Sequence, residues 1–272
     1  MQAPPLVYGT AWKEDETARL VGLALDAGFR GIDTANQRKH YHEAGVGAAL
    51  QDAFSHGLVE RDDLFLQTKF THIGGQDRRL PYDPKASVAS QVLQSFESSL
   101  RHLGVDHLDS YLLHGPSVPI GWADDDREAW SAMEDLQRSG RVTSIGVSNV
   151  SADQVEELYD EASVKPAAVQ NRCFTRPFAD RAVRDFCSQK GLTYQGFSLL
   201  TGHRTLLRDP QVHAVAHRLG ATIPQVVFGH CLRRGMVALT GTTSPRHMAD
   251  DLAAPGVPLT AADLETLDRA IG

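Results

Sequence analysis

The sequence has only three cysteines, at positions 173, 187 and 231, and no Cys-x-x-Cys pair. Their odd number and wide spacing argue against a disulfide framework and against a zinc knuckle. The chain also lacks any apolar stretch near the ~18 residues needed to cross a bilayer. Its first twelve residues show no basic region followed by an apolar run, as a secretory signal would. We therefore expect a cytoplasmic protein with no membrane partner.

An excess of positive charge is also missing, because 27 Lys and Arg face 34 Asp and Glu, for a net charge of −7. A nucleic-acid binder needs a basic stripe for phosphate contacts, so no nucleic-acid partner is expected. With 42% hydrophobic and 22% charged residues, the 272-residue chain is not disordered. We expect one domain spanning residues 1–272, as a monomer or weak oligomer, with a small molecule as its ligand.

Short strand-like runs alternate with helical patterns along the whole chain. One helix is predicted over 83–104, where Val88, Val92 and Phe96 continue an apolar face and Gly104 ends it. Parallel strands need helical crossovers, and eight such units match a (β/α)8 TIM barrel. A doubly wound sheet is the alternative, but no glycine fingerprint follows the first strand, and we interpret Gly45 and Gly47 as close helix packing. The strand-like runs lie near 6–11, 30–35, 64–70, 108–114, 143–149, 167–173, 192–199 and 236–242.

Polar residues stand at the carboxyl end of every predicted strand, where barrels collect their chemistry. Asp33, Lys69 and His114 end three neighbouring strands and could converge, with Asp33 as the partner that a buried lysine requires. A purely structural ion pair is the alternative interpretation. Tyr41 follows in the next loop, and an adjacent ammonium would lower its pKa and make it a proton donor. His114 could donate a hydrogen bond to a carbonyl oxygen. The remaining polar strand ends are Thr10, Ser148, Asn149, Gln170, Ser198 and Thr242.

Several segments, in order and with consistent spacing, carry a family resemblance. They include Gly28–Ala35, Gln67–Lys69, Asp109–His114 and Ile145–Asn149, followed by Gln170 and Ser198. In these segments the chain resembles the aldo-keto reductases, NAD(P)H-dependent carbonyl reductases built on a (β/α)8 barrel. The resemblance covers nearly the whole chain. It implies that Asp33, Tyr41, Lys69 and His114 are the catalytic residues, with Tyr41 as general acid.

The same resemblance implies where the cofactor would bind. Ser148, Asn149 and Gln170 would hold the nicotinamide carboxamide, and Phe197 would stack on the ring where the family usually has Tyr. The pyrophosphate and adenosine ends would lie along Ser198, Leu200 and the segment 241–251. The full implied cofactor set is Gly9, Thr10, Ala11, Asp33, Ser148, Asn149, Gln170, Phe197, Ser198, Leu200, Gly241, Thr242, Thr243, Ser244, His247 and Asp251.

Three departures from the family pattern bear on these expectations. The family usually has Tyr five residues after Asp, whereas Tyr41 lies eight after Asp33, and His40 is the rival for the proton-donor position. In the adenosine segment Gly241-Thr242 replaces Lys-Ser, His247 replaces Arg and Asp251 replaces Asn. Because Arg and Lys are the usual phosphate ligands, these changes weaken the preference for NADPH: it is still favoured, and NADH stays possible. The chain ends soon after its last helical pattern. We therefore expect loops 71–84 and 115–126, with Trp122, to shape an open substrate pocket.

The leading hypothesis is an NAD(P)H-dependent enzyme that reduces an aldehyde or ketone to an alcohol, with Tyr41 protonating the oxygen. The first alternative is a non-catalytic or redox-responsive nicotinamide-binding barrel, suggested by the shifted tyrosine. The second is a metal-dependent barrel hydrolase, since His40, His42, Glu43, Asp33 and His114 offer nitrogen and oxygen ligands. Such barrels usually carry His-x-His on the first strand, so we expect no metal here.

Overall fold

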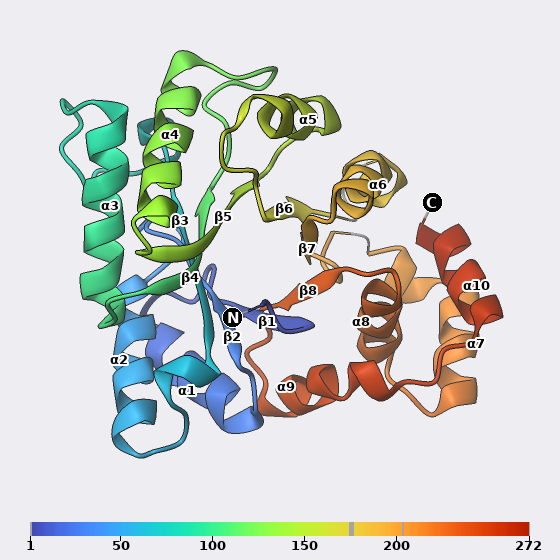
Figure 1. The fold of residues 1–272 in the computed structure, drawn as a ribbon. Coiled ribbons are helices and arrows are strands. Elements are labelled where there is room, and N and C mark those ends of the chain that lie inside the picture. Colours follow the sequence, from blue (N-terminus) through green and yellow to red (C-terminus); the bar gives the residue numbers. More distant parts are fainter. Residues whose placement is uncertain (1, 174–176, 203, 272) are drawn as a thin grey trace.

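Eight parallel strands close into one barrel, in chain order, with helices around the outside (Figure 1). The computed structural model describes residues 2–173, 177–202 and 204–271. Strand β8 returns to β1, with Tyr8 opposite Thr240, so no edge is left open in the barrel. This confirms the predicted (β/α)8 fold. The strands are β1 (Leu6–Gly9), β2 (Gly31–Asp33), β3 (Phe65–Phe70), β4 (Leu108–Leu113), β5 (Val142–Ser148), β6 (Ala168–Arg172), β7 (Thr193–Phe197) and β8 (Val237–Thr240).

The helices follow the strands as the alternating pattern predicted. The helix predicted over 83–104 begins later, at Val88, because the Ser87 side chain caps it by accepting from the Ser90 N–H. Its end at Gly104 is confirmed, with φ at 68°. The helices are α1 (Thr17–Ala27), α2 (Glu43–Ser55), α3 (Val88–Leu103), α4 (Asp124–Arg138), α5 (Ala152–Glu161), α6 (Arg181–Lys190), α7 (Pro210–Leu219), α8 (Ile223–Arg233), α9 (Pro245–Leu252) and α10 (Ala261–Ile271).

Most of the apolar core lies between the barrel wall and the helices. Along β3, Leu64 and Leu66 join this outer core, while Phe65 packs inside the barrel with Val7 and Leu239. The alternation predicted for this strand is therefore confirmed. The interior apolar cluster is small, and the buried Gln67 and Lys69 follow Phe65 on the same face of the strand. The carboxyl-terminal half of the barrel interior is thus polar, unlike the branched apolar layers usual in such barrels.

Gly47 confirms the helix packing expected for the Gly45–Gly47 segment. A Cβ atom at Gly47 would lie 1.9 Å from the carbonyl oxygen of His102 at the end of α3. Only a glycine therefore lets α2 approach α3 so closely. All three cysteines are buried and free. Within the described ranges, no helix is long and apolar enough to span a membrane.

Candidate active site

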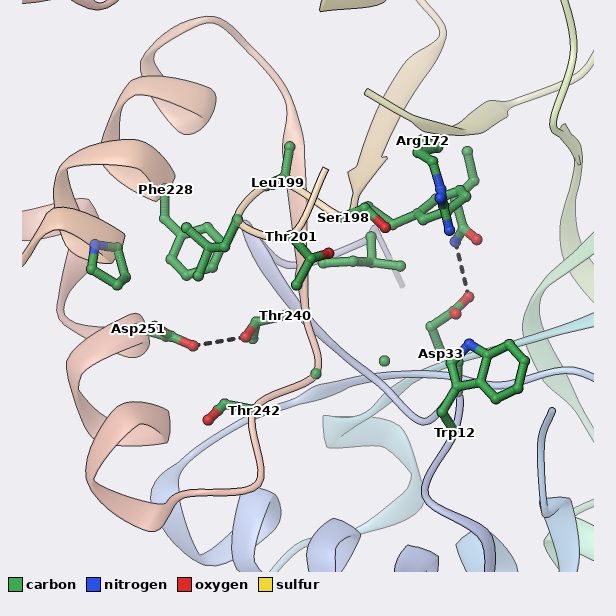
Figure 2. Close-up of a pocket in the computed structure, with 18 of the residues that line it drawn as sticks. Trp12, Asp33, Arg172, Ser198, Leu199, Thr201, Phe228, Thr240, Thr242 and Asp251 are labelled. Carbon is green, nitrogen blue, oxygen red and sulfur yellow. Dashed lines mark hydrogen bonds between the residues drawn. The ribbon is translucent and has the colours of Figure 1, made fainter. Parts of the chain in front are cut away.

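A cavity of about 800 Å³ opens at the carboxyl ends of the strands. Asp33 and Trp12 lie at one end of it, and Phe228 and Asp251 lie at the other (Figure 2). This is the face where barrel enzymes place their chemistry, as the polar strand ends predicted. The predicted site residues that line the cavity are Gly9, Ala11, Asp33, Tyr41, His114, Ser148, Asn149, Gln170, Phe197, Ser198, Leu200, Gly241, Thr242, His247 and Asp251.

Asp33 and Lys69 form a buried ion pair beneath the cavity. The Lys69 ammonium donates to both Asp33 carboxylate oxygens at 2.7 Å and to the carbonyl oxygen of Thr34 at 2.8 Å. The Lys69 side chain is 0% exposed. Burial lowers the pKa of Lys69, and the Asp33 carboxylate opposes that shift. The carboxylate partner predicted for this lysine is therefore the observed one.

Tyr41, rather than His40, packs against the lysine. The Lys69 ammonium lies 5.3 Å from the centroid of the Tyr41 ring. The same ring makes an edge contact with His114, at 5.8 Å between centroids. A turn in which the Tyr41 N–H donates to the Gln37 carbonyl at 3.0 Å brings the tyrosine into this position. Three of the four predicted catalytic side chains, Asp33, Tyr41 and His114, therefore line the cavity, and Lys69 lies behind them.

The predicted direction of the Tyr41 pKa shift is wrong. Burial raises the pKa of the Tyr41 hydroxyl, and the Asp33 carboxylate raises it further. The predicted lowering of the pKa took only the Lys69 ammonium into account. The Asp33 carboxylate accepts a hydrogen bond from that ammonium at 2.7 Å, and its negative charge offsets the effect of the ammonium on Tyr41. Tyr41 is therefore fully protonated at neutral pH, which keeps a proton available on the phenol.

His40 forms part of the cavity wall instead. Its ring stacks on Trp12, with 3.9 Å between the ring centroids, and its carbonyl accepts from the Trp12 N–H at 2.7 Å. Trp12 is 69% exposed and has a positive φ of 62°, a conformation that bulky residues rarely adopt. The sequence interpretation missed Trp12 as a site residue. Its position just beyond the carboxyl end of the first strand could have indicated that it belongs to the site.

His114 is held as a neutral imidazole. Burial, followed by the charge of Lys69, lowers the pKa of His114 to about 3. Its Nδ1 atom lies 2.7 Å from the hydroxyl oxygen of Thr71. When that hydroxyl donates to Nδ1, the ring proton sits on Nε2 and can be donated to a ligand. Thr71 directly follows β3, and the sequence interpretation did not assign it this contact.

Three buried glutamines form an amide network inside the barrel. The amide nitrogens of Gln67 and Gln170 both donate to one carboxylate oxygen of Asp33, at 2.7 and 2.9 Å. Both also donate to the side-chain oxygen of Gln195, at 2.8 and 2.9 Å. The network fixes the carboxylate that pairs with Lys69. Gln195 was missed, although it lies two residues before the predicted Phe197 and therefore on the same face of β7.

The residues predicted to hold a carboxamide meet at the ends of β5 and β6. The Ser148 hydroxyl donates to the Gln170 carbonyl at 2.6 Å, and the Asn149 amide donates to the His114 carbonyl at 2.8 Å. Asn149 has a positive φ of 59°, and Ser198, after β7, has one of 58°. Such conformations cluster at ligand sites, where they re-aim the chain.

The far end of the cavity carries a buried carboxyl group. Asp251 is 2% exposed, and the Thr240 hydroxyl donates to it at 2.7 Å. Burial raises the pKa of Asp251 to about 6. Among the predicted cofactor residues, three do not line the cavity. Thr10 is buried against the Asp33 carbonyl, Ser244 caps α9, and Thr243 lies beside it.

The predicted substrate-pocket loops are a further correction. Neither loop 71–84 nor loop 115–126 contributes a residue to the lining of the cavity. Trp122 is buried in the helical layer instead, where its indole N–H donates to the Gln154 carbonyl at 2.8 Å. Trp12, Arg172 and residues 198–201, after β7, line the cavity instead.

The ligands considered for a metal site do not converge. His42 contacts the Glu14 carbonyl at 3.2 Å, and Glu43 accepts from the Thr68 hydroxyl at 2.5 Å. His40 stacks on Trp12. In the part of the chain that the structure describes, no group of three or more His, Cys, Asp or Glu residues is arranged to hold a metal ion.

Comparisons with known proteins agree with this geometry. The model of the aldo/keto reductase family matches residues 5–271. An uncharacterized oxidoreductase, YtbE, of Bacillus subtilis is 29% identical over 93% of this chain and 83% of its own length. The glyoxal reductase of the same organism is 28% identical, with the same coverage. The rabbit (Oryctolagus cuniculus) prostaglandin-E(2) 9-reductase is 28% identical over 97% of this chain and 87% of its own.

Solved structures show the same barrel. An aldo/keto reductase from Brucella melitensis superposes with a TM-score of 0.82 at 28% identity, covering 98% of this chain and 95% of the other. The silkworm aldo-keto reductase AKR2E5, complexed with NADPH, gives 0.83 at 26% identity, covering 99% and 84%. The fold and the cavity define a barrel oxidoreductase. The chain belongs to the aldo/keto reductase family, whose enzymes use NAD(P)H.

Proposed function

We propose that this protein reduces the carbonyl group of an aldehyde or ketone with NAD(P)H, and that Tyr41 supplies the proton. One observation carries the proposal: the Tyr41 ring lies 5.3 Å from the Lys69 ammonium and against His114, at the wall of the cavity. A protonated phenol, a neutral imidazole and a fixed ion pair suit delivery of a proton to an oxygen that gains negative charge.

The residues present fit a nicotinamide dinucleotide. Among the described residues, the side-chain oxygens of Asn149 and Gln170 accept no hydrogen bond and can accept from a carboxamide N–H. Phe197 offers an aromatic face beside them. At the other end Thr242 and His247 line the space for the adenosine. We assign NADPH as the preferred cofactor, with NADH also accepted.

When bound, the reduced nicotinamide supplies a hydride to the carbonyl carbon. The chain's own residues handle the oxygen. The Nε2–H of His114 donates to the carbonyl oxygen and orients it. As negative charge develops there, the O–H bond of Tyr41 breaks and the O–H bond of the alcohol forms. The phenolate that remains lies beside the Lys69 ammonium, and water returns its proton.

The names of two relatives, a glyoxal reductase and a prostaglandin-E(2) 9-reductase, support a carbonyl substrate. The cavity also supports it, since its lining combines aromatic and apolar side chains with a few polar groups. The non-catalytic alternative rested on the shifted tyrosine, and the observed contact between Tyr41 and Lys69 removes that motivation.

The test is NADPH oxidation with 4-nitrobenzaldehyde, an activated aldehyde, using Tyr41→Phe. We expect turnover to fall at least 100-fold, while NADPH still binds, as followed by its fluorescence. His40→Phe is the matched control, because it keeps an aromatic ring against Trp12, and it should retain turnover. Loss of turnover in His40→Phe with full activity in Tyr41→Phe would assign the proton to His40. NADPH binding by the natural protein without turnover of any carbonyl would favour the non-catalytic alternative.

A further inference from the structure

Arg172 stands at the mouth of the barrel, where the sequence interpretation assigned no function. It is the last residue of β6 and lies opposite Phe197 in the strand register. Its guanidinium lies 5.8 Å from the centroid of the Phe197 ring, and both residues line the cavity. The close-up places Arg172 on the side of Asp33 and Trp12, away from Phe228 and Asp251 (Figure 2). Arg172 therefore belongs to the end of the cavity that holds the proton donor.

The charges at this end leave Arg172 uncompensated. Lys69 is neutralised by Asp33 at 2.7 Å. His114 and His40 both have lowered pKa values, chiefly through burial, and are neutral at pH 7. Among the described residues, Arg172 forms no ion pair, and its guanidinium lies over the Phe197 ring. This end of the cavity therefore carries a net positive charge.

Apart from Asp33, the other charged side chains of the lining lie at the far end, where they include both signs of charge. Arg246 lies 3.9 Å from Asp250, and Asp251 is buried nearby. An exposed guanidinium is a rigid planar fork, so it loses less conformational freedom for each hydrogen bond that it forms. Carboxylate and phosphate groups are the ligands that match this geometry.

We propose that Arg172 binds a carboxylate of the substrate, so that the enzyme prefers carbonyl compounds that carry an anionic group. This assignment rests on the proposed reductase function and names its substrate class. The diphosphate of the dinucleotide is the other source of the same anionic chemistry. Arg172 lies beside Phe197, at the end of the cavity proposed for the nicotinamide and the carbonyl, which favours the substrate.

The experiment compares 4-formylbenzoate with its methyl ester, two aldehydes that differ in charge at the remote group. The natural protein should show a higher kcat/KM for the carboxylate. In Arg172→Gln this preference should fall roughly 10-fold or more, mainly through KM, and in Arg172→Lys it should fall less. Arg269→Gln removes the same charge from α10, outside the cavity lining, and should keep the preference. An unchanged preference in Arg172→Gln would overturn the assignment.

Two binding measurements separate the possible failures. Calorimetry with 4-(hydroxymethyl)benzoate and its methyl ester, on the protein saturated with NADP⁺, needs no turnover, and the natural protein should bind the carboxylate more tightly. Equal affinities would overturn the assignment even if the enzyme is active. Fluorescence titration with NADPH tests the diphosphate, and weaker NADPH binding by Arg172→Gln with an unchanged substrate preference would assign Arg172 to the cofactor. Absence of all carbonyl turnover would instead refute the reductase function.

Discussion

The Lys69 ammonium donates to both carboxylate oxygens of Asp33 inside the barrel, where the two side chains are 0% and 4% exposed. Two glutamine amides donate to the same carboxylate. The pair therefore combines charge compensation with full hydrogen bonding, which a buried charge requires. The same pair lies directly beneath Tyr41, so its loss should affect both stability and turnover.

Breaking this pair on one side should cost more stability than removing it entirely. Lys69→Met leaves the Asp33 carboxylate buried without its cation, and we expect a loss of about 3–5 kcal/mol in the free energy of unfolding. Asp33→Asn combined with Lys69→Met removes both charges and should recover part of that loss. Turnover should stay low in every variant, because no ammonium remains beside Tyr41. Urea unfolding at pH 7 and NADPH oxidation measure the two effects. Strictly additive losses would contradict the coupling.

Gln195 should matter although it does not line the cavity. In Gln195→Leu the amide nitrogens of Gln67 and Gln170 lose a buried acceptor, and the Gln67 oxygen loses a donor at 3.0 Å. We expect a stability loss of about 1–3 kcal/mol and a lower kcat, because Asp33 loses its fixed position. Gln211→Leu, on the exposed surface of α7, is the control and should stay within about 0.5 kcal/mol of the natural protein. Equal stability of the two variants would refute the role of the network.

Two helix glycines offer a matched comparison of packing. In Gly47→Ala the new Cβ would lie 1.9 Å from a backbone oxygen of α3, so the helices must separate. We expect a loss of about 3 kcal/mol or more. A Cβ at Gly22 in α1 meets nothing within 4 Å, so Gly22→Ala should gain about 0.5–1 kcal/mol from the better helix former. Thermal unfolding measures both, and a tolerated Gly47→Ala would show that α2 is not closely packed on α3.

The barrel and much of its polar face could be predicted because strands have a strict period of two residues. That period placed Phe65, Gln67 and Lys69 on one face, and the neighbouring strand ends then brought Asp33 and His114 close. The order of short apolar runs and helical stripes fixed the architecture in the same way. Local sequence patterns are therefore sufficient to predict the parts of the fold that repeat one strand–helix unit.

Features set by contacts between distant segments could not be predicted in this way. Trp122 was expected at the cavity, yet a carbonyl on α5 holds it in the helical layer. The direction of the Tyr41 pKa shift depends on burial and on Asp33, neither of which one neighbouring lysine reveals. The roles of Gln195 and Arg172 depend on their neighbours across the sheet, and these neighbours are known only once β6 and β7 are paired in register.

The carboxyl group of Asp251 should make stability depend on pH. Burial raises its pKa to about 6 in the folded protein, against an ordinary value near 3.8. Between about pH 4 and pH 6 the folded state therefore binds more protons than the unfolded state, so this group lowers stability as pH rises through that window. Asp251→Asn removes the ionisation while an amide oxygen can still accept from Thr240. Above pH 6 the variant should be more stable than the natural protein by up to roughly 3 kcal/mol.

Urea unfolding at pH 4.5 and pH 8 tests this, because comparison of two proteins at each pH cancels the titration of all other groups. The advantage of Asp251→Asn should be small at pH 4.5 and full at pH 8. Thr240→Val is a second variant, since the Thr240 hydroxyl donates to the carboxylate and holds its pKa down. Its loss should raise the pKa of Asp251 further, so the stability cost of Thr240→Val should be larger at pH 8 than at pH 4.5. An advantage of Asp251→Asn that is the same at both pH values would mean that Asp251 ionises as freely in the folded protein as in the unfolded chain.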